Sequence, residues 1–86
     1  MKRPTTLALR ARILALRWRR VHAAMRVLAA DSIASQIAAV GADGFAQMRA
    51  TGYQIATADA LREIEHQLRR TRRALCRLKA QEEMWK

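Results

Sequence analysis

The chain has 86 residues, a mass of 9.8 kDa and a formal net charge of +10 at pH 7. This length predicts one domain and excludes a two-domain enzyme with a cleft between its domains. Three glycines and one proline are too few for a β-sandwich or a low-complexity linker. The single cysteine, Cys76, excludes an internal disulfide and a cysteine-rich zinc module. It fits a reducing compartment, so we expect a cytoplasmic protein.

The positive charge is unevenly distributed along the chain. No Asp or Glu precedes Asp31, whereas the first thirty residues contain eight Lys and Arg residues. Residues 31–60 are slightly acidic, and residues 61–86 again carry a net charge of +4. Two basic arms around a nearly neutral middle attract polyanions, namely nucleic acid, an anionic membrane face or an acidic protein.

Neither a secretory signal nor a membrane span is expected. Arg10, Arg12 and Arg17 interrupt every apolar run near the N-terminus, so the continuous apolar core of a signal peptide is absent. No run approaches the roughly 18–20 apolar residues of a spanning helix. A role on the membrane surface is also unfavoured, because arginines divide the apolar residues of this segment into patches.

A first long helix is predicted over residues 5–30, with Pro4 and the hydroxyls of Thr5 and Thr6 at its start. Apolar residues then recur at alternating intervals of four and three, which is typical of a helix packed nearly parallel to another. We call this set the first stripe: Leu7, Ala11, Leu14, Trp18, Val21, Met25 and Leu28. The first stripe is predicted to be the seam between two helices, with Trp18 as a buried anchor.

The same helix carries another apolar set, roughly opposite the first stripe. We call it the second stripe: Leu9, Ile13, Leu16 and Val27. One partner helix cannot cover a helix that is apolar on two faces. Two interpretations remain open, a central helix of a three-helix domain or a helix with one face against another chain. In the latter case the second stripe is the partner-binding surface of a helical adaptor or co-chaperone.

The apolar pattern changes phase at Asp31 and Ser32, which indicates either a helix break with a new cap or a stutter in one continuous helix. We favour a bend, followed by a bent continuation over residues 32–40. Gly41 is then the predicted C-cap of this segment.

A short helix is predicted over residues 43–51, with Asp43 as its N-cap and Gly52 at its end. Large side chains in and after this segment are expected to pack over the ends of the long helices. They are Phe45, Met48, Tyr53 and Ile55.

The last helix is predicted over residues 54–85, again with a seam at intervals of three and four. The seam positions are Leu61, Ile64, Leu68, Thr71, Leu75, Leu78, Glu82 and Trp85. The polar Thr71 is a candidate for setting the register between helices.

The chain is therefore predicted to be one all-α domain over residues 1–86, a long antiparallel helical hairpin with one or two short connecting helices. Because such a hairpin buries little apolar surface, we expect self-association or incorporation into a larger complex.

Residues with catalytic or metal-binding chemistry are scarce. His22 and His66 have no second ligand three or four positions away, and Cys76 has no CxxC partner. The carboxylates of residues 59–65 lie beside arginines, and this neighbouring positive charge disfavours a metal site built from carboxylates. No phosphate-binding glycine loop is present. We expect no enzyme, no metal, no cofactor and no small-molecule substrate.

Arginines recur along one line of each long helix, away from its predicted seam. On the last helix, intervals of four, three, four and four separate Arg62, His66, Arg69, Arg73 and Arg77. On the first helix, intervals of seven separate Arg12, Arg19 and Arg26. Neighbouring positions on the line of the last helix are about 5–6 Å apart, a scale comparable to that of successive phosphates on a strand. The alternative is a solvated face with salt bridges such as Glu65 to Arg69, but one glutamate cannot neutralise five cations.

These lines predict a non-catalytic basic subunit that binds nucleic-acid backbone within a larger assembly, with RNA slightly preferred over DNA. The predicted contact residues are Arg12, Arg19, Arg26, Arg62, Arg69, Arg73 and Arg77. No stacking platform of interleaved aromatic residues is present, so contacts to phosphates are expected to dominate. Such binding depends strongly on salt and weakly on sequence. Protein partners or a homo-oligomer are expected as well.

Overall fold

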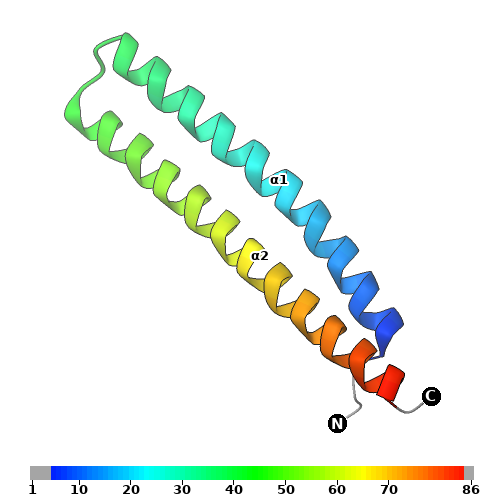
Figure 1. Ribbon diagram of the computed structural model, residues 1–86. Helices are drawn as coiled ribbons and strands as arrows, with labels where there is room; N and C mark the ends of the chain where they lie inside the picture. The colour runs from blue at the N-terminus through cyan, green and yellow to red at the C-terminus, as the bar shows by residue number, and fades with distance from the viewer. Residues whose placement is uncertain (1–4, 85–86) are drawn as a thin grey trace.

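The computed structural model describes residues 5–84 as two long antiparallel helices (Figure 1). Helix α1 covers Thr6–Ala39 and helix α2 covers Gly44–Met84. The two helices lie side by side along their length, with the beginning of α1 and the end of α2 at one end of the hairpin and the connection at the other. The molecule measures 66 × 18 × 18 Å. The predicted all-α hairpin is confirmed.

Local side chains begin and end these helices as the sequence predicts. The Thr5 hydroxyl accepts a hydrogen bond from the Ala8 amide at 3.0 Å and so caps α1. Gly41 follows α1 with a φ of +66°, a left-handed conformation that glycine adopts without steric cost. The Asp43 carboxylate accepts a hydrogen bond from the Ala46 amide at 2.9 Å, at the start of α2.

Both helices are longer than the sequence pattern predicts. Helix α1 passes through Asp31 and Ser32 without a break, so the bent continuation over residues 32–40 is part of one helix of 34 residues. The segment predicted as a short helix over 43–51 is the beginning of α2, and Gly52 lies inside that helix. Within residues 5–84, therefore, no separate connecting helix joins the two long ones.

The two apolar stripes of α1 have exchanged their predicted roles. Leu9 and Leu16 of the second stripe are buried, and Ile13 and Val27 are half-buried. The large residues of the first stripe are between 50% and 78% exposed, including Trp18 at 68%. The prediction that the first stripe is the helix–helix seam, with Trp18 as its buried anchor, is wrong. The second stripe packs against α2.

The length of each stripe explains this choice of face. The second stripe continues at intervals of three and four beyond Val27, through Ala30, Ala34 and Ile37, which are buried or half-buried. The first stripe ends at Leu28, because Ser32 takes the next position. A stripe along the whole of α1 covers more of α2 than one that ends after about two-thirds of the helix. The change of phase near residue 31 is therefore a change from one stripe to the other, and the helix itself is regular.

Small side chains form the centre of the interface between the helices. Ala23 and Ala30 of α1, together with Ala50 and Thr57 of α2, are buried. Larger core residues lie toward the end with the termini, where Leu68 is only 2% exposed. Alanine and threonine allow two helix backbones to approach closely, although they bury less apolar area than leucine.

The predicted seam of α2 is confirmed from Leu61 to Leu78, where every seam position is buried or half-buried. The buried Thr71 hydroxyl donates to the Gln67 carbonyl of its own helix at 2.8 Å, so this hydrogen bond contributes nothing to the register between helices. Glu82 is exposed and accepts a hydrogen bond from the Thr6 hydroxyl at 2.9 Å. The last seam position, Trp85, lies outside the described residues.

The large residues near the connection do not cover the ends of the helices. Phe45, Met48, Tyr53 and Ile55 are all exposed, so the prediction that they pack over these ends is wrong. The reason is geometric, because the short connection over residues 40–43 leaves no separate helix that could fold back over the hairpin. The Arg49 guanidinium instead lies over the Phe45 ring, 4.7 Å from its centroid.

Neither α1 nor α2 is apolar enough over a sufficient length to cross a membrane.

Candidate nucleic-acid interface

A groove runs along one side of the hairpin, between α1 and α2. Arg12, Arg19 and Arg26 line it from α1, and their spacing of seven residues keeps them on one side of that helix. The α2 residues that line it recur at the same spacing, which places the separate hollows in one row. They are Tyr53, Ala60, Gln67 and Ala74.

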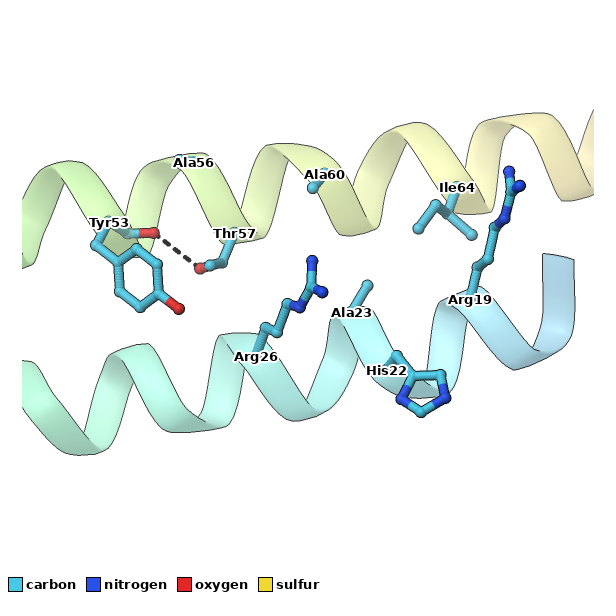
Figure 2. Close-up of a pocket in the computed structure, with 9 residues that line it drawn as sticks. All are labelled: Arg19, His22, Ala23, Arg26, Tyr53, Ala56, Thr57, Ala60 and Ile64. Carbon is cyan, nitrogen blue, oxygen red and sulfur yellow. Dashed lines mark hydrogen bonds between the residues drawn. The ribbon is translucent and has the colours of Figure 1, made fainter.

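One hollow of this groove, with a volume of about 580 Å³, lies near the middle of the hairpin. Its wall on α2 consists largely of short side chains, Ala56, Thr57 and Ala60, so the space between the helices stays open. In Figure 2 the guanidinium groups of Arg19 and Arg26 extend from α1 toward α2 across this space. This part of the groove therefore combines two cations with a small, uncharged wall, an arrangement that attracts anions.

A second basic surface lies on α2, away from α1. We call it the arginine face, which consists of Arg62, His66, Arg69, Arg73 and Arg77. All of its members are exposed. They span 16 residues of a regular helix, about 22 Å for 15 steps of about 1.5 Å each. The arginine face and the groove are therefore different surfaces, and the structure does not bring all seven predicted contact arginines into one site.

Arg70 connects these two basic surfaces. Its side chain lines the groove beside Arg12, and Arg77 of the arginine face lies seven residues further along the same side of α2. The positive charge consequently extends from the groove around α2 to its outer face. Sequence reasoning missed Arg70, although its interval of seven from Arg77 of the arginine face was a readable signal.

Most of these arginines have no acidic partner. Within residues 5–84 one ion pair forms, between Arg62 and Asp59, and both side chains are largely exposed. The pair of Glu65 with Arg69, which the solvated-face interpretation requires, is absent from the same part of the chain. Exposed guanidinium groups without intramolecular partners keep their donors available for phosphate oxygens.

Other polar side chains bond within the hairpin. The Gln54 amide donates to the Asp31 carboxylate at 3.0 Å, and the Gln67 amide donates to Glu63 at 3.2 Å. These bonds occupy carboxylates that could otherwise pair with arginine, which leaves the positive surface less neutralised.

Histidine and cysteine do not come together in a site. The His22 ring stacks on Trp18 with centroids 6.3 Å apart, and His66 and Cys76 are exposed on α2. Over the part of the chain that the structure describes, no three His, Cys, Asp or Glu residues form a group that could hold a metal ion.

The residues predicted as a partner-binding surface lie inside the hairpin. Leu9, Ile13, Leu16 and Val27 face α2, so they are not available to another protein while the hairpin is intact. The apolar surface that α1 leaves exposed is the first stripe.

No family model matches this chain, and neither the curated proteins nor the solved structures include a significant match.

Proposed function

We propose that the chain is a non-catalytic basic subunit that binds the phosphate backbone of nucleic acid, with RNA slightly preferred, inside a larger assembly. The observation that carries the proposal is the arginine surface that extends from the groove to the arginine face with one ion pair along its described length. A polyanion gains favourable contacts there without having to displace internal carboxylates.

The rigidity of the hairpin favours binding to backbone. Each arginine projects from the interior of a long helix, so its origin is fixed before a ligand arrives and only side-chain freedom is lost on binding. Phosphate contacts of this kind release counterions and carry no direct sequence information. The expected activity is therefore strong at low salt, weak at high salt and nearly independent of base sequence.

The test is a titration of the full chain against a fluorescent single-stranded RNA and the corresponding DNA at several salt concentrations. The variant Arg69→Gln, Arg73→Gln, Arg77→Gln should weaken binding and flatten the dependence of affinity on salt by up to about three phosphate contacts. The matched control is Arg10→Gln, Arg17→Gln, Arg20→Gln, which removes the same charge from α1 outside the groove. It should retain most of the affinity and most of the salt dependence.

A further variant measures how much the groove contributes to the affinity for nucleic acid. Arg12→Gln, Arg19→Gln, Arg26→Gln should also weaken binding more than the matched control does, because these side chains line the groove. If the wild-type chain shows no retention on RNA or heparin at low salt, the proposal is wrong. Equal losses in all three variants would also contradict it, because binding would then follow net charge alone.

The second candidate function is a helical adaptor that docks on a partner protein. The exposed apolar residues of α1 favour it, although they belong to the first stripe and not to the residues first assigned. A pull-down with and without nuclease separates the two candidates. Loss of all partners after nuclease supports nucleic-acid binding, whereas a stoichiometric protein that remains at high salt supports the adaptor.

A further inference from the structure

The first stripe is an apolar surface of α1 that α2 does not cover. Its large residues are Leu7, Leu14, Trp18, Val21, Met25 and Leu28, all at least half exposed. Together with Ala11 they follow intervals of three and four over 22 residues, a length of about 32 Å at about 1.5 Å per residue. Contiguous exposed apolar surface of this kind on a small protein marks an interaction site.

The spacing of the first stripe fits another helix. Alternation of three and four keeps the large side chains in two adjacent rows, the arrangement in which each inserts between four residues of a facing helix. Along one border of these rows, at intervals of seven, lie Ala8, Ala15, His22 and Ala29, and the three alanines allow a second backbone to come close on either side of the His22 ring.

The charge beside the first stripe defines the partner further. Leu14, Trp18 and Val21 surround a shallow hollow of about 340 Å³, and the other residues that line it are Arg17 and Arg20. No acidic residue precedes Asp31, which lies just beyond the last residue of the stripe. At its centre the apolar surface is therefore bordered by the positive charge of Arg17 and Arg20, and the sequence before Asp31 holds no carboxylate to neutralise it.

This charge disfavours a second copy of the chain as the occupant. If two first stripes packed in antiparallel fashion about their centre, Trp18, the arginines beside each hollow would face those of the other copy. The outer face of α2 is no better as a partner for the stripe, because it is apolar only near Phe45, Met48 and Ile55 and basic beyond them.

We infer that the first stripe is a docking surface for an amphipathic helix of a partner protein, with apolar residues at heptad spacing and acidic residues beside them. The apolar rows supply affinity through burial, with Trp18 at the centre, and the arginine border selects carboxylates. The inference does not depend on nucleic-acid binding, because the first stripe and the arginine face lie on opposite sides of the hairpin.

The experiment uses the full chain and labelled synthetic peptides of about three heptads. The first peptide has Leu at its seam positions and Glu on both flanks, the second has Lys in place of Glu, and the third is a scrambled version of the first. We expect the Glu-flanked peptide to bind, with an affinity about tenfold or more above that of either control peptide. Equal binding of the scrambled peptide would overturn the inference, because charge alone would then explain the complex, as would no binding of the Glu-flanked peptide.

Two variants of the chain locate the site. Leu14→Gln, Trp18→Gln, Met25→Gln changes three exposed residues of the first stripe, so the helical content should be unchanged while peptide binding falls about tenfold or more. The matched control, Phe45→Gln, Met48→Gln, Ile55→Gln, removes exposed apolar residues from α2 and should leave peptide binding unchanged. Equal effects of the two variants would contradict the assignment.

The same variants test whether the first stripe instead binds a second copy of the chain or a membrane surface. Sedimentation of the wild-type chain should give a monomer, and vesicles of anionic lipid should bind the wild-type chain and the first-stripe variant equally. A dimer that dissociates in the first-stripe variant would overturn the inference in favour of a second copy. Vesicle binding lost in that variant alone would overturn it in favour of a membrane surface.

Discussion

Helix α1 carries two apolar stripes that differ in residue size and in burial. The buried second stripe is interrupted by and continued with small buried residues, Ala23 and Ala30, whereas the exposed first stripe is built of larger residues such as Trp18. If hydrophobicity alone chose the packed face, the first stripe would face α2. The difference shows that the length of a stripe and its fit to the opposing helix decide the packing of a hairpin, since small residues permit close contact where the two helices meet at the centre of the interface.

The largest expected effect comes from the same truncation made in each stripe. Leu16→Ala should lower the free energy of unfolding by about 2–5 kcal/mol, because Leu16 is 2% exposed and its removal leaves a cavity against α2. Leu14→Ala should change it by no more than about 0.5 kcal/mol, since Leu14 is exposed. Urea denaturation followed by circular dichroism measures both. Equal losses would mean that both stripes are buried in solution.

Enlarging a small residue tests how closely the helices approach. Ala30 is fully buried, so Ala30→Leu should lower the free energy of unfolding by about 1–3 kcal/mol through overpacking. Its exposed neighbour provides the control, and Ala29→Leu should be nearly neutral. Thermal denaturation of the two variants compares them directly. A stabilising Ala30→Leu would show that the centre of the interface has room to spare.

The smallest effect is expected at the polar position of the seam of α2. Thr71→Val should change the free energy of unfolding by less than about 1 kcal/mol, because the lost hydroxyl bonds only to the Gln67 carbonyl of the same helix. Chemical denaturation of the variant is the measurement. A loss well above this size, or a change in oligomeric state, would restore a register-setting role to Thr71.

The sequence predicts the fold class, the caps and the seam of α2 because these depend on local patterns. Thr5, Gly41 and Asp43 act through contacts within a few residues, and the seam of α2 is the single regular apolar row of its helix. The packed face of α1 could not be predicted in this way, because two regular rows compete there and the outcome depends on the facing helix.

The basic surfaces are only partly readable from the sequence. Periodicity places the arginine face on the outside of α2 without knowledge of its neighbours. The groove depends on which residues of α2 lie across from Arg12, Arg19 and Arg26, and this follows from the antiparallel pairing and from the choice of the second stripe as the seam. Assigning the wrong stripe to the interface therefore also hid the groove and the role of Arg70.

The most direct test of which stripe packs against α2 is whether Trp18 of the first stripe is exposed in the monomeric hairpin. In the variant Trp85→Phe, Trp18 is the single tryptophan, so its fluorescence reports on this position alone. At concentrations where sedimentation shows a monomer, we expect the emission of a solvent-exposed indole and quenching by acrylamide nearly as strong as in the urea-unfolded chain. Blue-shifted emission that is protected from acrylamide until the chain unfolds would contradict the account, because the first stripe would then face α2.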